Sequence, residues 1–332
     1  MRTEANFAPL LQRFFTDRLM RQKQASPHTI CSYSDTFRLL LAFLQKKLRK
    51  PPSRLLLEEL EAPLVLEFLD EMEKERAVSP RSRNLRLAAI RSFFHYVAFE
   101  APANAGQIQR VLAIPGKRFP HALVDFLSRP EAEALLQSPK LETWSGRRDH
   151  ALMLLALQTG LRLSELTSLK TEDVSLKSGG HVRVLGKGRK ERCTPLTKRT
   201  VTVLREWLKE PPRGNNGFIF TNTRGGKLSS DGVQYIMNKH VAIASANCST
   251  LSSKCVTPHV LRHTAAMELL LAGVDRTVIA LWLGHESIET TQIYLDANLA
   301  MKEAALAKTR PLGEMPRRYK PDDALLGFLK SL

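Results

Sequence analysis

The sequence predicts a mainly α-helical protein of two domains, in which an N-terminal helical bundle precedes a mixed α/β domain with a small antiparallel sheet. Apolar residues recur at helical spacing through most of the chain. This periodicity is lost over 101–122, which is rich in Ala, Pro and Gly and is the best candidate for a linker. Residues 180–196 alternate apolar and polar side chains around a Gly-rich turn, as in a β-hairpin.

The first hundred residues contain four helical patterns. Ser26 and Ser79 are each followed by proline, a pairing that favours an N-cap and a first helical position. Four helices joined by short connections, with little strand signal between them, indicate a small bundle. The expected helices cover 7–23, 26–50, 62–77 and 79–100.

The fourth of these helices has an apolar face and a basic end. Arg81, Arg83 and Arg86 occupy its first turns, where they could lie along a phosphate backbone or form an ordinary solvated face. Further basic residues that could contact DNA are Lys117, Arg118, Arg189 and Lys190. The residues expected to be buried are Leu87, Ile90, Phe94 and Val97.

The second domain starts with a capping box formed by Ser128 and Glu131. A strongly apolar helix, a turn and a second helical start follow over 147–169, and helices dominate again from 197 to 310. The expected domain boundaries are 1–110, 111–122 for the linker, 123–320, and 321–332 for a C-terminal helix.

Charge and composition restrict the class of protein. Lys and Arg total 50 against 33 Asp and Glu, so the net charge of +17 favours a polyanionic partner such as nucleic acid, although basicity for solubility alone is an alternative. The N-terminus does not resemble a secretory signal, and no run approaches the length of a membrane span. Four scattered cysteines indicate neither a disulfide framework nor a zinc site, so a reduced, cytoplasmic protein is expected.

Five short segments carry residues suited to chemistry on an anion: 159–166, 185–192, 257–266, 282–288 and 291–296. Each has an ordinary interpretation on its own. Arg162 could merely pair with Glu165, Lys187 could belong to a polar turn, and Tyr294 could be a core aromatic. His259 and Arg262, however, share one face of a helix whose N-terminus suits an anion. The six residues that stand out together are Arg162, Lys187, His259, Arg262, His285 and Tyr294.

The order and spacing of these six residues resemble the tyrosine recombinase (phage integrase) family. The contexts "TGLRLSEL", "HVLRH" and "LGH", with a tyrosine nine positions after the last of these, carry the resemblance over about 120–310. The resemblance implies a SAM-like core-binding domain followed by a catalytic domain. It also implies double-stranded DNA as substrate and a homotetramer on that DNA, with the helix at 321–332 docking on its own or a neighbouring subunit.

The resemblance further implies a role for each residue. Tyr294 would be the nucleophile, with His259 as its base and Lys187 as the acid for the leaving 5′ oxygen. Arg162 and Arg262 would bind the phosphate oxygens, His285 would bind the phosphate or Tyr294, and Glu165 would hold the site in place. Neither metal nor ATP nor another cofactor is expected.

Site-specific recombination or integration, on behalf of a mobile element, is the function that the sequence favours. A type IB topoisomerase is one rival, because it shares the nucleophile and similar cations. A DNA-binding regulator that keeps the fold without catalysis is another, although such a protein has no need of Tyr294.

Overall fold

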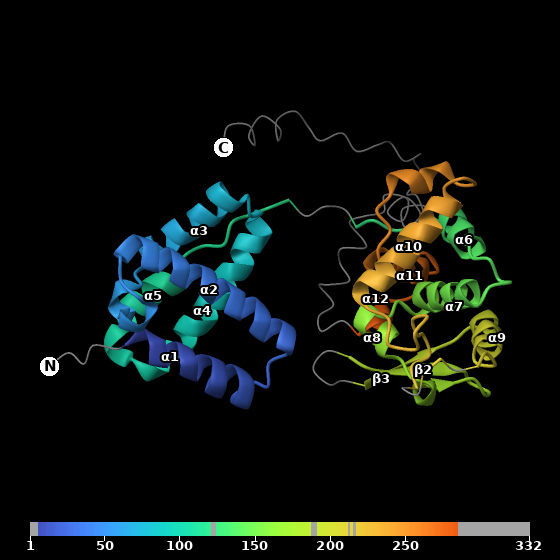
Figure 1. The fold of residues 1–332 in the computed structure, drawn as a ribbon, viewed down its shortest axis with the longest axis horizontal. Coiled ribbons are helices and arrows are strands. Elements are labelled where there is room, and N and C mark those ends of the chain that lie inside the picture. The colour runs from blue at the N-terminus through green and yellow to red at the C-terminus, as the bar shows by residue number, and fades with distance from the viewer. Residues whose placement is uncertain (1–5, 121–123, 187–190, 212, 215–216, 285–332) are drawn as a thin grey trace, which may run out of the picture. The chain divides into compact units, whose positions relative to one another are not determined.

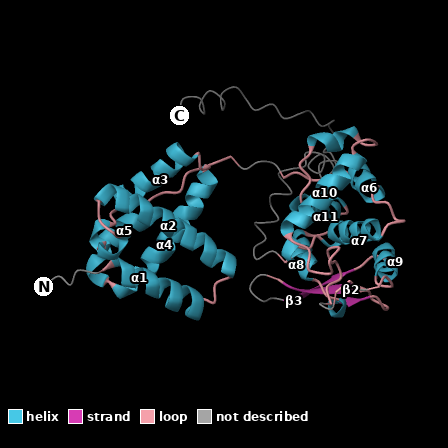
Figure 2. Cartoon of the chain, viewed as in Figure 1, coloured by secondary structure: helices cyan, strands magenta, loops and turns pink. Residues whose placement is uncertain are grey.

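The chain divides into two compact units, residues 1–121 and 122–332. The computed structural model describes residues 6–120, 124–186, 191–211, 213–214 and 217–284 (Figure 1). Helices account for most of both units, and the strands are confined to the second, as Figure 2 shows. The predicted fold class is confirmed. Among the described helices, none is long and apolar enough to cross a membrane.

The N-terminal unit is a helical bundle with an aromatic centre. The side chains of Phe7, Phe14, Phe37 and Phe93 are buried and meet mostly edge to face, with the Phe14 and Phe93 ring centroids 5.5 Å apart. The helices are α1 (Phe7–Arg13), which continues as a π-helix over Phe14–Gln22, α2 (Pro27–Leu48), α3 (Ala62–Arg76), α4 (Pro80–Glu100) and α5 (Ala105–Leu112).

Two predicted caps fix where helices of this unit begin. The hydroxyl of Ser26 accepts a hydrogen bond from the backbone N–H of Thr29, and Ser79 accepts one from Ser82. The apolar face expected on α4 is also confirmed, since its four predicted residues are at most 1% exposed. Local sequence therefore determines both the start and the buried face of this helix.

Helix α5 corrects the expectation that residues 101–122 lack regular structure. Ile108 and Val111 of α5 are buried in the core of the N-terminal unit. The side-chain amide of Gln107 donates to the carbonyl oxygens of Leu57 (2.6 Å) and Leu60 (3.0 Å). Eight residues are too short to show a clear helical period, so tertiary contacts decide the structure here.

The C-terminal unit packs helices against a three-stranded antiparallel sheet in the order β1-β2-β3. Its strands are β1 (Val174–Ser175), β2 (His181–Leu185) and β3 (Glu191–Pro195), and β2 pairs with β3 from His181 opposite Pro195 to Leu185 opposite Glu191. The predicted hairpin is thus confirmed. The helices are α6 (Arg129–Gln137), α7 (Trp144–Thr159), α8 (Leu163–Ser168), α9 (Lys198–Trp207), α10 (Ser230–Ala244), α11 (Pro258–Leu271) and α12 (Arg276–Leu283).

The capping box at the start of α6 also ties two distant segments together. Glu131 accepts from the backbone N–H of Ser128 (2.7 Å), from the Thr250 hydroxyl (2.7 Å) and from Lys254 Nζ (2.6 Å). Burial raises the pKa of the Glu131 carboxyl, but these hydrogen bonds outweigh burial and lower the pKa to about 2. The segment before α11 is thereby attached to α6, and α11 carries two of the expected site residues.

Candidate active site

The turn between α7 and α8 places Arg162. Helix α7 ends at Gly160, whose φ of +63° lies in the left-handed region that favours glycine. Arg162 is the N-cap of α8, and its backbone N–H donates to Glu165 Oε2 at 2.7 Å. The break in the apolar helix therefore places an arginine at a fixed position, immediately before α8.

The guanidinium of Arg162 has two partners from different parts of the chain. Its Nη1 donates to Glu165 Oε1 (3.1 Å), and its Nη2 donates to the carbonyl oxygen of Gly284 (2.7 Å) at the end of α12. The interpretation that Arg162 only pairs with Glu165 is therefore incomplete.

Arg262, on α11, binds the same end of α12 as Arg162 does. It lies in the first turns of α11, which Thr257 caps, and is 5% exposed. Its Nη1 donates to the carbonyl oxygen of Gly160 (2.6 Å) and its Nη2 to that of Leu283 (2.8 Å). Arg162 and Arg262 thus bind consecutive carbonyl groups although they are far apart in sequence.

Arg192, on β3, completes the cluster and was not among the residues singled out from the sequence. Its Nε donates to the Trp282 carbonyl (3.1 Å), and its Nη1 and Nη2 donate to the two oxygens of Glu165 at 2.9 and 2.7 Å. The sequence feature that could have identified Arg192 is the two-residue period of a strand. This period places Arg192 on the same face of β3 as the buried Thr194. Three guanidinium groups therefore bind the last three carbonyls of the α12 segment, those of residues 282, 283 and 284. We call Arg162, Arg192, Arg262 and Glu165 the arginine cluster.

The electrostatics of the arginine cluster favour an anion. Burial raises the pKa of the Glu165 carboxyl, but the hydrogen bond from Arg192, the backbone N–H of Arg162 and both positive charges lower it below its usual value. Glu165 is therefore ionised at neutral pH. Three guanidinium groups and one carboxylate leave a net charge of about +2, which attracts an anion.

His259 lies on the exposed side of α11, one turn from His263, and the two rings stack with centroids 6.4 Å apart. His263 therefore shares a face of α11 with His259. Burial and the nearby His259 and Arg262 lower the pKa of His263 to about 4, against the effect of Asp125. His263 is thus neutral at pH 7 and adds no positive charge beside His259.

Several expected site residues lie outside the described part of the chain: Lys187, Arg189, Lys190, His285 and Tyr294, as does the helix expected at 321–332. Two of them adjoin described residues, since Lys187 follows Gly186 at the end of β2 and His285 follows Gly284.

The basic residues proposed as DNA contacts in the N-terminal unit differ in exposure. Arg81 and Arg118 are exposed, and Arg86 is half-buried. The expectation that Arg83 contacts DNA is wrong. Its side chain is only 3% exposed, and its guanidinium nitrogens lie 3.4 Å from Glu73 and 4.0 Å from Asp70. A side chain buried against two carboxylates cannot lie along a phosphate backbone.

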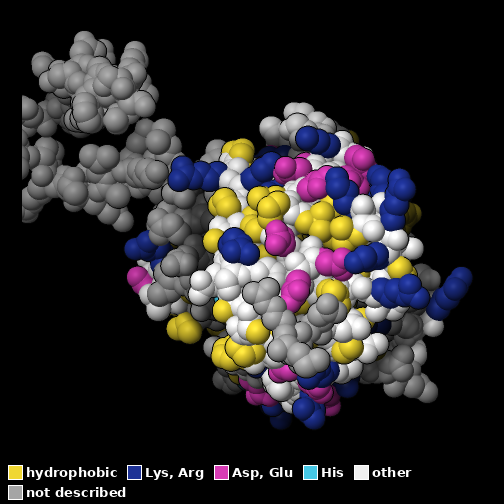
Figure 3. Space-filling model, turned by 90° about the vertical axis from the view of Figure 1, so that its left-hand side faces the viewer, with side chains coloured by type: hydrophobic (Ala, Val, Ile, Leu, Met, Phe, Trp, Pro, Cys, Tyr) yellow, Lys and Arg dark blue, Asp and Glu magenta, His cyan; other side chains and the backbone are white. Residues whose placement is uncertain are grey.

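Lys117 is exposed but also pairs with Glu73. On the face shown in Figure 3, Lys and Arg side chains alternate with Asp and Glu rather than forming an uninterrupted basic surface. Several lysines of the N-terminal unit contact a carboxylate, as Lys47 contacts Glu67 and Lys50 contacts Glu59. The net charge of the sequence is therefore partly compensated locally.

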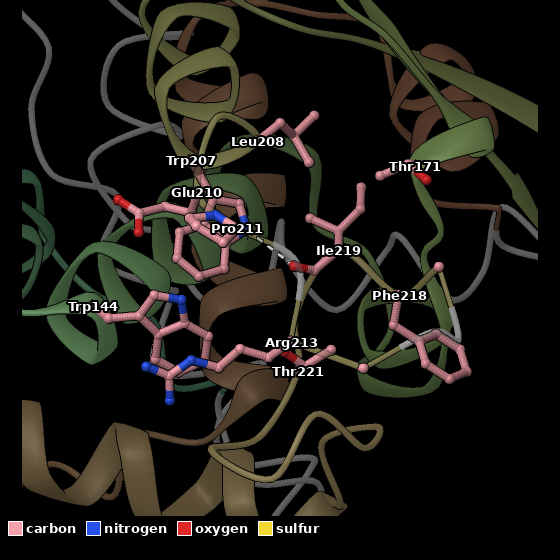
Figure 4. Close-up of a pocket in the computed structure, with 12 residues that line it drawn as sticks. Trp144, Thr171, Trp207, Leu208, Glu210, Pro211, Arg213, Phe218, Ile219 and Thr221 are labelled. Atoms are coloured by element: carbon pink, nitrogen blue, oxygen red, sulfur yellow. Dashed lines mark hydrogen bonds between the residues drawn. The ribbon is translucent and has the colours of Figure 1, made fainter.

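A separate cavity lies away from the arginine cluster. Trp144 and Trp207 line it, and the Arg213 guanidinium stacks 3.8 Å from the Trp144 ring centroid (Figure 4). Trp207 donates its indole N–H to the Ile219 carbonyl at 2.9 Å. The cavity shares no lining residue with the arginine cluster, and we assign it to packing. Among the described residues, no group of His, Cys, Asp and Glu is arranged to hold a metal ion.

The chain is similar to known proteins along most of its length. A model of the phage integrase family matches residues 125–301, and a model of the N-terminal SAM-like domain of phage integrases matches residues 11–100. An integrase/recombinase of Sinorhizobium fredii is 63% identical over 332 residues. The match covers 100% of this chain and 100% of that protein. Tyrosine recombinase XerC of Pelobacter propionicus is 32% identical over 315 residues, which cover 93% of this chain and 98% of XerC.

Two solved structures have the same fold. One is XerH site-specific recombinase bound to its difH substrate, with a TM-score of 0.66, 22% identity, and coverage of 86% of this chain and 81% of that one. The other is the Tn1549 transposon integrase in complex with circular intermediate DNA, with a TM-score of 0.67, 16% identity, and coverage of 90% and 99%.

Proposed function

Because the chain belongs to the phage integrase family, whose members include the tyrosine recombinases, we propose that it cuts and rejoins DNA strands at specific sites through a 3′-phosphotyrosyl link to Tyr294. The observation that carries this proposal is the convergence of Arg162 and Arg262 on consecutive carbonyl groups. Two guanidinium groups held that close together suit two non-bridging oxygens of one phosphate.

The chemistry follows from the charge of the transition state. Attack on the phosphorus atom builds negative charge on the non-bridging oxygens, which preorganised guanidinium groups stabilise. Each guanidinium has five N–H donors, and the neutral carbonyls of Leu283 and Gly284 are weaker acceptors than an anionic phosphate. A phosphate can therefore engage Arg162 and Arg262 without first breaking a strong ion pair between either of them and α12.

The remaining steps are proton transfers. Tyr294 supplies the nucleophilic oxygen, and His259, exposed on α11, accepts the phenol proton. Lys187 donates a proton to the departing 5′ oxygen, and His285 binds the phosphate or Tyr294. The phosphotyrosyl link keeps the energy of the broken ester, so the reaction runs in both directions without ATP. We assign it no cofactor.

The proposed substrate is double-stranded DNA, and the proposed assembly on it is a homotetramer, because recombination requires four cleavages. Two solved relatives, XerH bound to its difH substrate and the Tn1549 transposon integrase in complex with circular intermediate DNA, support this choice. Arg81, Arg86 and Arg118 are the proposed phosphate contacts of the N-terminal unit. We further propose that a mobile element encodes the enzyme and that it acts in the cytoplasm.

A covalent adduct tests the proposal. Duplexes that bind the protein are selected from a randomised pool. Each selected duplex is nicked near the centre of the segment that the protein protects from nuclease, and is then incubated with the protein. A protein–DNA adduct that survives denaturant is expected for the wild type, while Tyr294→Phe should bind the same duplex without forming an adduct. Absence of the adduct with wild-type protein would favour the regulator, and relaxation of plasmids that lack a selected site would favour the topoisomerase.

The general acid can be tested separately. Lys187→Ala should slow cleavage of an ordinary strand by about 10²–10⁴-fold, the range typical of acid catalysis. A substrate with a 5′-sulfur leaving group needs no proton, so it should restore the rate. If the sulfur substrate is cleaved as slowly as the ordinary one, Lys187 is not the acid.

A further inference from the structure

Arg192 has a contact pattern that a solvent-exposed strand residue would not have. Its Nη1 and Nη2 donate to the two carboxylate oxygens of Glu165, at 2.9 and 2.7 Å, and its Nε donates to the Trp282 carbonyl at 3.1 Å. The guanidinium therefore connects β3, α8 and α12 at one point. Its side chain is 11% exposed and that of Glu165 5%. Both terminal nitrogens of Arg192 bind this carboxylate, so a phosphate could bind Arg192 only by breaking the ion pair.

The same carboxylate that binds Arg192 also orients Arg162. Glu165 Oε1 accepts from Arg162 Nη1 at 3.1 Å, and Oε2 accepts from the Arg162 backbone N–H at 2.7 Å. A carboxylate held by two parallel N–H bonds has a fixed plane. Without Arg192, the Glu165 carboxylate could rotate. The Arg162 guanidinium, which donates to that carboxylate, would then no longer be held in one orientation.

The end of α12 depends on the Arg192 side chain as well. A Cβ atom on Gly284 would lie 2.9 Å from Arg192 Nη1 and 3.2 Å from its Cδ, so the two residues fit closely. Gly284 has a φ of +65° and immediately precedes His285 in the chain. Arg192 thus packs against the residue from which the chain continues to two of the expected catalytic groups, His285 and Tyr294.

We propose that Arg192 is a positioning residue for strand cleavage, which orients Arg162 through Glu165 and fixes the end of α12. The inference rests on the proposed function. Arg192 itself makes no contact with DNA in this role. A lysine cannot replace it, because a single ammonium group cannot bind both carboxylate oxygens and the Trp282 carbonyl in this fixed geometry.

The test compares Arg192→Ala and Arg192→Lys with Arg205→Ala. Arg205, on α9, is a matched control because it donates to the carbonyl of Leu176 at 2.9 Å but belongs to no ion pair of the arginine cluster. Three quantities are measured for each variant on the selected nicked duplex: the rate of adduct formation at saturating protein, the Kd for the duplex, and the thermal unfolding midpoint.

We expect Arg192→Ala to lower the cleavage rate by about 100-fold, the effect of a small displacement of a catalytic group, with Kd changed less than about threefold. Arg192→Lys should recover little of the rate although it keeps the charge. Millimolar guanidinium ion should partly restore cleavage by Arg192→Ala and leave Arg205→Ala unchanged, a rescue that a purely structural role would not give.

The outcomes separate this inference from the proposed function. Cleavage by Arg192→Ala within about threefold of wild type overturns the positioning role while the adduct at Tyr294 stands. If Arg192→Ala does not fold, Arg192→Lys decides: a wild-type rate overturns the role, and a tenfold loss at an unchanged unfolding midpoint supports it. If wild-type protein forms no adduct at all, the proposed function itself is wrong.

Discussion

Gly160 has two separate physical reasons to be glycine. Its φ of +63° costs an L-residue about 1–2 kcal/mol, and a Cβ there would lie 2.5 Å from Leu283 Cδ2 and 3.2 Å from Ala265 Cβ. Leu283 is fully buried, so it has little room to move. Its carbonyl receives the Arg262 hydrogen bond, and the Gly160 carbonyl receives another. Strain at this position therefore acts directly on Arg262, one of the two arginines proposed to bind the phosphate.

Gly160→Ala is expected to lower the free energy of unfolding by about 2–5 kcal/mol, the sum of backbone strain and overpacking. Gly273→Ala is the matched control, because Gly273 has a φ of +81° but nothing within 4 Å of the added Cβ. It should lose only the backbone strain of about 1–2 kcal/mol and keep its cleavage rate. Urea unfolding and single-turnover cleavage measure the two effects. Equal losses in both variants would show that the contact with Leu283 carries no energy.

Local sequence predicted the ends of elements but not the arginine cluster as a whole. Ser26 and Ser79 as N-caps follow from short-range chemistry, and both are confirmed. Arg162, Arg262 and Glu165 were found through a known spacing. Arg192 was missed because its partners, Glu165 and Trp282, lie 27 and 90 positions away, and no local pattern reports contacts at that separation.

Helix α11 is the element on which the expected catalytic groups depend most directly. Thr257 accepts a hydrogen bond from the backbone N–H of Val260 at 3.3 Å, which holds the first turn. That turn carries His259, and Arg262 lies in the next one. Fraying of this single helix end would therefore move the proposed base without disturbing the core.

Thr257→Ala should cost about 1 kcal/mol of stability, the usual cost of losing an N-cap, and should also slow cleavage. Ser229→Ala is the control, since Ser229 caps α10 in the same way, accepting from Gly232 N–H at 3.0 Å, and α10 carries no expected catalytic residue. Chemical denaturation should show similar losses for both variants. If Ser229→Ala slows cleavage as much as Thr257→Ala does, the effect comes from general destabilisation rather than from the position of His259.

Elements were easier to predict when they were long and amphipathic. Helix α4 was predicted with its start and buried face, since 21 residues reveal the helical period. Helix α5 was missed, because its place depends on Gln107 bonding to Leu57 and Leu60, some fifty positions earlier.

At the scale of the whole molecule, the net charge of +17 gives a quantitative expectation for DNA binding. Lysine and arginine side chains that neutralise phosphates release counterions, so the logarithm of the binding constant falls linearly with the logarithm of the salt concentration. Local ion pairs such as Lys47 with Glu67 reduce the number of cations available. The slope is therefore a measure of how many basic residues face the DNA.

We expect affinity for the selected duplex to fall by about 10³–10⁵ between 50 and 200 mM salt, the range for six to ten phosphate contacts. Arg86→Ala should reduce the slope by about one, because it removes one phosphate contact. Lys209→Ala, which removes a lysine bound to Glu206 at 2.8 Å, should leave the slope unchanged. Fluorescence anisotropy across a salt series measures all three. A flat salt dependence for the wild type would mean that the excess charge serves solubility, and an unchanged slope for Arg86→Ala would remove the start of α4 from the DNA-binding surface.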